Sequence, residues 1–388
     1  MYKKILVIKL RHIGDVLLTT AVFKALKQNF PESFVAALVN KGTEAVIERN
    51  PYLDEIITYD RQIKKLPFYK KYWEEIKFLM KVKNMSFDTT IDLTGGDRAA
   101  LISYLSGAKK RVGIKAKGFL GKKYLYTELF EIDISKHILL QNLEVLERIG
   151  IKTDKPEVFL NVTEDEKKWA RKLIFSGVKL SSQSKIIHIH PTSRWLFKCW
   201  KDEYVAEVIK WFLEKGCIVV LTSSSEQKEM KKIQAILSNI PSNLIYEPSY
   251  QAFSDNKVCN SEIKEKTSYI INLSGKLTLR QLIAVSSVCD IYFGIDTAPM
   301  HIAAALGKPV IALFGPSGAF NWGPWDNDSN TNPYPERNGI QRFGKNIVIQ
   351  RNWQCIPCGQ DGCKGIKISK CLFDIKPDEV IEILKSFV

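Results

Sequence analysis

Short apolar runs rich in β-branched residues alternate along the chain with longer amphipathic stretches. Between the first two runs, the spacing of "DVLLTTAVFKALKQNF" (15–30) predicts one helix that stops before Pro31. Strands that alternate with helices indicate βαβ units and a parallel sheet. In the first third of the chain, the runs that predict strands are 4–10, 34–40, 55–60, 88–93 and 111–114.

A second series of the same kind follows. Its helix, "DEYVAEVIKWFLEKG" (202–216), ends at Gly216. The runs that predict its strands are 185–191, 217–223, 268–275, 290–296 and 308–315. Residues 150–165 carry a glycine, a proline and then charged residues, which is typical of a linker. The sequence therefore predicts an α/β fold with two Rossmann-like domains, 1–160 and 166–350. A cysteine-containing tail, 351–388, ends in an amphipathic helix that we expect to pack on the body.

Composition narrows the class of protein. With 45% hydrophobic and 26% charged residues in 388, the chain is typical of a globular protein. No stretch approaches the roughly 18 to 20 apolar residues that a membrane span needs. The apolar run in "MYKKILVIKL" is too short for a signal peptide, so we expect a cytoplasmic protein.

The formal net charge is +15, and lysines cluster in "KKLPFYKKYW" (64–73) and "GAKKRVGIKAKGFLGKK" (107–123). Such runs bind nucleic acid, an anionic membrane or a phosphate-rich substrate, or they form solvated surface without a binding role. Because no nucleic-acid-binding signature accompanies them, we expect no nucleic-acid partner.

The stretch "LPFYKKYWEEIKFLM" (66–80) places apolar side chains on one helical face and lysines on the other. The apolar residues are Leu66, Tyr69, Trp73, Ile76 and Met80. We favour a helix that faces the core of the first domain. The alternative is contact with the surface of the cytoplasmic membrane.

Three loops that follow strands carry polar residues, and in open α/β sheets ligands bind at the carboxyl ends of strands. After the first strand, Gly14 frees the turn and Asp15 stands at the helix start, where a carboxylate either caps backbone amides or faces a cleft. After 185–191 come Thr192, Ser193 and Lys198. This arrangement is either turn chemistry or a clamp for a diphosphate.

The third loop, in "FGIDTAPMHIAAALGKPVIALFGPS" (293–317), places Asp296 and Thr297 at a helix start and His301 one turn later. A helix start offers amides and a positive dipole end to phosphate oxygens. Alternatively, this is a capped crossover helix with a core histidine. Taken with the other two loops, the binding interpretation is the stronger one.

The cysteines and one acidic cluster are the residues that raise the question of whether the chain binds a metal ion. Cys199, Cys217, Cys259 and Cys289 are scattered and expected to be reduced. The tail cysteines are Cys355, Cys358, Cys363 and Cys371. Their spacing does not decide among structural zinc, free thiols and a disulfide pair. We interpret "DND" (326–328) as a loop and not as a metal site, because it lies outside the series of strands.

"ILVIKLRHIGDVLLTTAVFKALKQNFP", "IHPTSRWLFKCW" and "FGIDTAPMHIAAALGKPVIALFGPS" together resemble the signature regions of the glycosyltransferase family 9 heptosyltransferases. The cysteine-containing tail is most similar to the heptosyltransferase III branch. The resemblance implies a GT-B architecture, in which two Rossmann-like domains with parallel sheets face each other across a cleft. It also implies inverting transfer from ADP-heptose to the inner core of lipopolysaccharide, with no cofactor and no essential metal.

The resemblance also implies roles for single residues. Asp15 matches the general base, and Lys198 with Thr192 and Ser193 matches the diphosphate-binding segment. The residues that match the donor site are Asp296, Thr297, Ala298 and His301, with Glu226 as a candidate ribose contact; Ala298 stands where many members have glycine. "DLTGGDRAALISYLSGAKKRVGI" (92–114) resembles the acceptor side. The acceptor-binding candidates are Gly14, Arg98, Lys109, Lys110 and Arg111.

The expected partners are therefore ADP-heptose, the lipopolysaccharide inner core and, peripherally, the inner face of the inner membrane. Three alternatives remain at this point: another nucleotide sugar as donor, a non-catalytic nucleotide-sugar-binding protein, and a sugar-nucleotide epimerase, which needs no acceptor.

Overall fold

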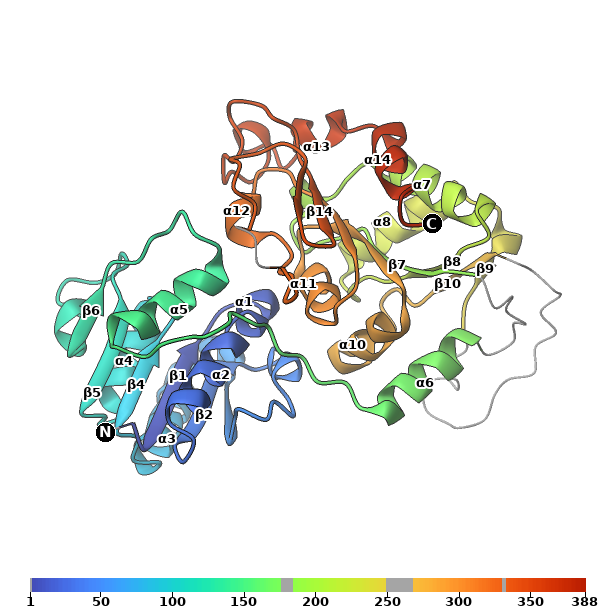
Figure 1. Ribbon diagram of the computed structural model, residues 1–388. Helices are drawn as coiled ribbons and strands as arrows, with labels where there is room; N and C mark the ends of the chain where they lie inside the picture. Colours follow the sequence, from blue (N-terminus) through green and yellow to red (C-terminus); the bar gives the residue numbers. More distant parts are fainter. Residues whose placement is uncertain (1, 176–183, 249–267, 330–332) are drawn as a thin grey trace. The chain divides into compact units, whose positions relative to one another are not determined.

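The chain folds into two compact units, unit 1 (Met1–Asn161) and unit 2 (Val162–Val388). A computed structural model describes residues 2–175, 184–248, 268–329 and 333–388 (Figure 1). Each unit is a twisted sheet with helices on both faces, so the predicted α/β class is confirmed. Cys259, expected to be reduced, lies outside the described residues.

Unit 1 is built on a six-stranded parallel sheet in the order β3-β2-β1-β4-β5-β6. Its strands are β1 (Lys4–Lys9), β2 (Phe34–Asn40), β3 (Glu55–Tyr59), β4 (Thr89–Asp92), β5 (Lys110–Ile114) and β6 (Glu128–Phe130). Its helices are α1 (Ile13–Leu17), α2 (Thr20–Asn29), α3 (Phe68–Asn84), α4 (Asp97–Leu105) and α5 (Ile138–Arg148), with 3₁₀ turns η1 (Glu44–Val46), η2 (Arg61–Lys65) and η3 (Lys122–Leu125). The strand order reverses between β1 and β4, which is the switch point where such sheets bind ligands.

The helix expected over 15–30 is in fact two helices, α1 and α2. The break falls at Leu18 and Thr19, where threonine hydroxyls bond to nearby backbone carbonyls. Thr19 Oγ1 donates to the carbonyl of Asp15 at 2.8 Å and Thr20 Oγ1 to that of Leu17 at 2.7 Å. Such local bonds compete with continuous helix.

The expectation that the aromatic face of α3 packs on the core is wrong. Of the residues of α3, all of which the structure describes, Val82 alone is buried. Val82 packs with Ala99 and Ile102 of α4 and with Leu6 and Ile8 of β1. Phe78 and Leu79 are partly buried against the same cluster, so the helix contacts the core through its C-terminal half. Tyr69, Trp73, Ile76 and Met80 are exposed and face away from it.

Unit 2 is built on an eight-stranded sheet in the order β13-β14-β12-β11-β7-β8-β10-β9, parallel except for the β13–β14 hairpin. Its strands are β7 (Ile186–His190), β8 (Ile218–Leu221), β9 (Ile245–Tyr246), β10 (Tyr269–Asn272), β11 (Ile291–Ile295), β12 (Val310–Leu313), β13 (Gln341–Phe343) and β14 (Asn346–Ile349). Its helices are α6 (Glu164–Phe175), α7 (Asp202–Glu214), α8 (Gln227–Leu237), α10 (Leu279–Val288), α11 (Ala298–Ala305), α12 (Ala319–Trp322), α13 (Lys370–Asp374) and α14 (Pro377–Leu384), with 3₁₀ turns η4 (Leu196–Lys198), η5 (Ser242–Leu244) and η6 (Cys363–Gly365).

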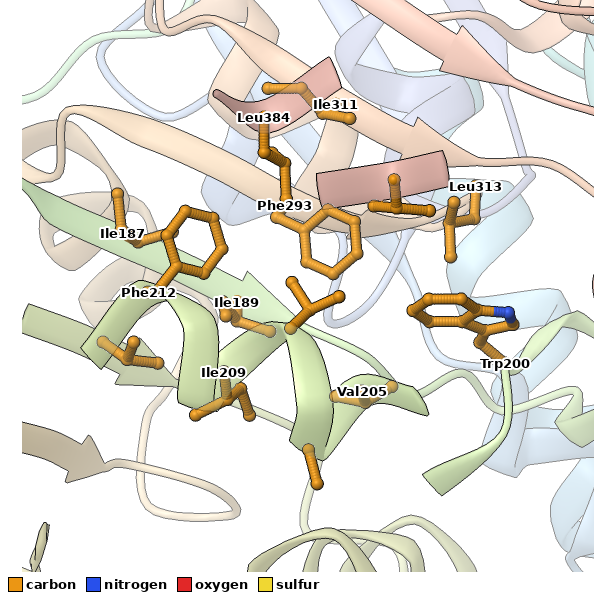
Figure 2. Close-up of a cluster of buried hydrophobic side chains, with 14 of the residues drawn as sticks. Ile187, Ile189, Trp200, Val205, Ile209, Phe212, Phe293, Ile311, Leu313 and Leu384 are labelled. Atoms are coloured by element: carbon orange, nitrogen blue, oxygen red, sulfur yellow. The ribbon is translucent and has the colours of Figure 1, made fainter. Parts of the chain in front are cut away.

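The larger core cluster of unit 2 joins the sheet to α7 and to the C-terminal helices (Figure 2). Phe212 of α7 and Phe293 of β11 meet there, and Leu384 of α14 is fully buried in the same cluster. Trp200 also belongs to it, and its indole N–H donates to the carbonyl of Ile375 at 3.1 Å. The expected packing of the amphipathic C-terminal helix on the body is confirmed.

Among the described residues, no helix combines the length and the apolar character that crossing a bilayer would require.

Candidate functional site

The two loops of unit 2 that were predicted to bind a diphosphate leave the sheet side by side. β7 and β11 pair in parallel, with Gly294 opposite His190. From β7 the chain runs outward to β8 and to the edge strand β9, comes back to β10 between them, and then returns to β11 on the other side of β7. This is the switch point of the second sheet, and Lys198 and Asp296 follow its two strands.

Lys198 and Asp296 form the central ion pair of this site. Lys198 Nζ lies 2.5 Å from Asp296 Oδ2. Asp296 is only 8% exposed. Burial favours the neutral carboxyl, but Lys198, Ser317 and His301 together hold the pKa of Asp296 below its ordinary value. Asp296 is therefore ionised, and it fixes the Lys198 side chain beside the start of α11.

The start of α11 presents backbone amides that the side chain of its N-cap residue does not occupy. Thr297 is the N-cap residue, yet its side chain does not cap the helix; its hydroxyl donates to the carbonyl of Ile295 at 3.4 Å. Pro299 occupies the first turn, where its missing N–H costs nothing. Ala298 begins the helix without a positive φ, so the backbone at this position does not require glycine. His301 is buried in the next turn.

Thr192 and Ser193 are both buried, and their hydroxyls have partners within the protein. Thr192 Oγ1 donates to Glu229 Oε2 at 2.8 Å, and Ser193 Oγ accepts the N–H of Trp195 at 3.2 Å. Glu229 accepts a second bond from Ser224 at 2.6 Å. The hydroxyls thus shape the loop around Lys198.

Glu226, the candidate ribose contact, is exposed at the N-cap of α8. The acid that the structure places in the site is Glu229, which is buried one turn into the helix. Sequence reasoning missed it. The available signal was helical: residues three positions after an N-cap point back over the first turn, toward the loops at that edge.

Two histidines of β7 lie behind this loop. His188 Nε2 and His190 Nδ1 each lie 2.9 Å from Thr222 Oγ1, and His188 Nδ1 lies 3.2 Å from Ser286 Oγ. Burial, with a smaller contribution from the neighbouring His190, lowers the pKa of His188 to about 3. His188 is therefore neutral at pH 7 and serves as a hydrogen-bonding core group.

We expect this histidine to make unit 2 sensitive to mild acid. The unfolded imidazole binds a proton near pH 6.5 and the folded one only near pH 3, so the unfolded state takes up more protons as the pH falls. Its contribution is fully present above pH 6.5 and is lost progressively below it, by about 2 kcal/mol at pH 5. Urea unfolding at pH 7 and pH 5 measures the loss. His188→Asn should reduce this loss of unfolding free energy by that amount. His12→Asn, at an exposed histidine, should leave it unchanged. An equal loss between pH 7 and pH 5 in the unaltered chain and both variants would contradict the assignment.

In unit 1, Asp15 lies at the switch point, on α1 after β1. The N-cap residue is His12, and Asp15, three positions on, accepts the N–H of His12 at 3.3 Å. Asp15 is half-buried. It therefore contributes only one long bond to the helix start, and most of its acceptor capacity is left for other partners. The expectation that Gly14 frees a turn is wrong, because Gly14 lies within α1 without a positive φ.

Two cations near Asp15 were not singled out in the sequence. Lys9 is buried at the end of β1, where its ammonium donates to the carbonyl of Leu93 and to Asn142 Oδ1, both at 3.0 Å. Burial lowers the pKa of Lys9 to about 8, and the negative charge of Asp15 partly opposes this. Arg11, in the same loop, donates to the carbonyl of Thr94 at 2.9 Å. Both residues stand in "IKLRHIGD", so their nearness to Asp15 in the sequence was the available signal.

Arg98 lies on α4, after β4, at the same edge of the sheet as Asp15. Its guanidinium is engaged within the protein: it donates to Glu75 Oε1 at 2.5 Å and to the hydroxyl of Tyr59. It also stacks over the Tyr59 ring, 4.6 Å from the centroid.

Lys109, Lys110 and Arg111 are not brought together with Asp15. They lie at the start of β5, whose first residue pairs with Thr89 of β4, which in turn pairs with Ile5 of β1. Asp15 follows the opposite end of β1. Since a strand rises about 3.3 Å per residue, the length of β1 separates the two edges. The sequence reveals that these residues are basic, but the strand direction places them at the amino edge of the sheet.

The tail cysteines and the acidic loop were the candidates for metal. Cys355, Cys358, Cys363 and Cys371 are free thiols in the structure, as are Cys199, Cys217 and Cys289. Across the described ranges, no three His, Cys, Asp or Glu side chains are grouped to hold a metal ion. Asp326 is buried and accepts the backbone N–H of Lys345 at 2.8 Å, so it supports the turn of the β13–β14 hairpin.

Known proteins resemble this chain in sequence and in fold. The chain is 29% identical over 353 residues to lipopolysaccharide heptosyltransferase 3 of Escherichia coli K12, covering 88% of this chain and 92% of that protein. Among solved structures, a family 9 glycosyltransferase from Veillonella parvula matches with a TM-score of 0.74 and 22% identity, covering 99% of this chain and 97% of the other. E. coli ADP-heptose lipopolysaccharide heptosyltransferase II matches with a TM-score of 0.71 and 20% identity, covering 99% and 98%. These structures share the GT-B fold with this chain.

The model of glycosyltransferase family 9 (heptosyltransferase) matches residues 76–247 and 250–347, which is more than half of the chain. With two Rossmann-like units in the GT-B architecture and polar loops at both switch points, this chain belongs to glycosyltransferase family 9 and is a glycosyltransferase.

Proposed function

We propose that this enzyme transfers a heptose from ADP-heptose to the inner core of lipopolysaccharide, with inversion at the anomeric carbon. The observation that carries the proposal is the Lys198–Asp296 ion pair at the start of α11, at the switch point of unit 2. The names of two relatives support it. One is lipopolysaccharide heptosyltransferase 3, and the other is an ADP-heptose lipopolysaccharide heptosyltransferase.

Unit 2 holds the leaving group. When the bond between the sugar and the diphosphate breaks, the electron pair stays on a diphosphate oxygen, and negative charge grows there. The Lys198 ammonium and the amides at the start of α11 are donors held in advance for that charge. Asp296 keeps Lys198 in place through its short ion pair. Preorganisation of this kind lowers the barrier because nothing must reorient during the reaction.

Unit 1 supplies the base. Asp15 takes the proton of the acceptor hydroxyl while that oxygen forms its bond to the anomeric carbon and ADP departs. A single displacement of this kind inverts the anomeric centre, and the proton ends on the Asp15 carboxyl. The one long hydrogen bond that Asp15 makes within α1 leaves its remaining lone pairs for this role. Lys9 and Arg11 place positive charge at the same edge, which favours anionic acceptors.

We place the acceptor on the inner face of the inner membrane and the enzyme at that surface as a peripheral protein. No nucleic acid and no cofactor enter the mechanism.

A donor and acceptor panel tests the proposal. Purified enzyme is given ADP-heptose, ADP-glucose or a UDP-sugar, together with lipopolysaccharide cores of defined truncation, and the released nucleotide is measured. We expect ADP release from ADP-heptose only when a core acceptor is present. Turnover of ADP-heptose without acceptor, preference for a UDP-sugar, or donor binding without any transfer would each contradict it.

A further inference from the structure

The outward face of α3 carries large apolar side chains that nothing within unit 1 covers. Tyr69, Trp73, Ile76 and Met80 are 69%, 68%, 53% and 50% exposed. They stand at spacings of four, three and four residues, so they form one stripe along the helix. Burying such side chains against water-free surroundings is worth about 1.5 to 3 kcal/mol each. A stripe of this size is therefore costly to leave in water.

Lysines border this stripe. Lys70, Lys77 and Lys81 each stand one position further round the helix than a member of the stripe, and all three are exposed. Between Arg61 and Asn84 the chain has eight basic residues and only two acidic ones. One of the two acids, Glu75, is already paired with Arg98. The surface thus combines an apolar stripe with a row of positive charge.

Elements next to α3 in unit 1 also carry exposed apolar side chains. α4 packs in the same core cluster as α3, so both helices cover one face of the sheet. Leu101 and Tyr104 of α4 are exposed, as are Leu120 and Tyr124 in the lysine-rich loop around η3, which contacts α4. Of the exposed large hydrophobic side chains in the described residues, most belong to unit 1.

We infer that the α3 face, defined as Tyr69, Trp73, Ile76 and Met80 with Lys70, Lys77 and Lys81, docks unit 1 on an anionic lipid bilayer. The charge pattern selects this partner. Aromatic and apolar side chains enter the boundary between headgroups and acyl chains, while lysines reach the anionic headgroups. A protein partner would instead favour a core depleted of lysine. The inference rests on the proposed function and deepens it, because it names the surface through which the enzyme meets the membrane that carries its acceptor.

Sedimentation with lipid vesicles tests the inference. The full chain is mixed with vesicles of phosphatidylglycerol and phosphatidylcholine, or of phosphatidylcholine alone, and the bound fraction is measured. We expect binding to the anionic vesicles, weakened by salt. Lys70→Gln/Lys77→Gln should weaken this binding by about 30-fold, from the usual contribution of about 1 kcal/mol for each lysine near an anionic surface. Trp73→Gln/Ile76→Gln should weaken it by about 10-fold or more.

Matched controls come from unit 2. Lys168→Gln/Lys210→Gln removes two exposed lysines, and Ile340→Gln/Ile366→Gln removes two exposed isoleucines. Both control variants should bind vesicles as the unaltered chain does. All α3 variants should keep full activity on a lipid-free core oligosaccharide and lose it on acceptor embedded in vesicles.

Four outcomes would overturn the inference. The unaltered chain could fail to bind anionic vesicles, or the α3 variants could bind as well as the controls. The α3 variants could lose activity on the lipid-free acceptor as well, which would place the face in the fold or in catalysis. Finally, Trp73→Gln/Ile76→Gln could abolish a dimer seen in sedimentation velocity while vesicles are not bound, which would assign the face to a second copy of the chain. Activity of the unaltered enzyme on the lipid-free acceptor tests the proposed function separately in every case.

Discussion

Asp15→Asn should reduce turnover by about 10²- to 10⁴-fold, the usual contribution of a positioned general base. Asparagine keeps nearly the same size and an oxygen that can accept the His12 N–H, but it cannot take a proton. Binding of ADP-heptose should change little, because we propose that unit 2 holds the donor. ADP release under saturating donor and acceptor measures turnover, and a titration with donor alone measures binding.

The comparison with Asp15→Ala separates the base from a helix cap. Alanine removes both the proton acceptor and the bond to His12, and since that bond is long, the loss of stability should stay below about 1 kcal/mol. If capping were the only role of Asp15, the asparagine variant would be nearly fully active and the alanine variant would be impaired in proportion to its lost stability. Full activity in the asparagine variant would refute the role of Asp15 as general base.

Lys198→Met should lower turnover by about 10²- to 10³-fold, as loss of one preorganised donor to a leaving group does elsewhere. ADP binding should weaken by about 10-fold or more, because a hydrogen bond to a charged group is lost. Adenosine has no diphosphate, so its binding should be unchanged. Calorimetric titration with ADP and with adenosine, together with the ADP-release assay, measures these effects.

The ion pair complicates this variant, because removing the lysine leaves Asp296 buried without its closest cation. Lys198→Met/Asp296→Asn removes both charges and should restore much of the stability without restoring turnover. Lys201→Met, at a lysine just outside the site, is the matched control and should behave like the unaltered enzyme. Recovery of turnover in the double variant would mean that Lys198 serves only to neutralise Asp296.

The sequence predicted the strands that form the centre of both sheets, because parallel strands buried on both faces are nearly continuous apolar runs. All ten predicted runs are strands in the structure, within a few residues at each end. Of the strands that were not predicted, β6, β9 and β13 are edge strands of three residues or fewer, so their pattern is too brief to recognise. The fourth, β14, is next to the edge strand β13, with which it forms a hairpin.

The sequence does not show whether a helix face points toward the core or toward solvent, or at which edge of the sheet a residue lies, and the predictions about side chains depended on both. The spacing in α3 correctly indicated which residues share a face, but only the packing of Val82 against the sheet shows that this face points outward. Lys109 to Arg111 are basic in any fold, yet the register of β5 places them at the amino edge. Glu226 and Glu229 differ by less than one helical turn, and the geometry of α8 buries the second and exposes the first.

The burial of α14 in the core of unit 2 bears on how the protein folds as it leaves the ribosome. Unit 1 is closed by residue 161, so its sheet can form while the rest of the chain is still being made. Unit 2 must wait, because Leu372, Val380 and Leu384 fill the same cluster as β7 and β11. The nascent chain therefore carries a folded unit 1 next to an incomplete unit 2 until α13 and α14 have been made. Premature termination just before α13 would leave those central strands uncovered and exposed to chaperones and proteases.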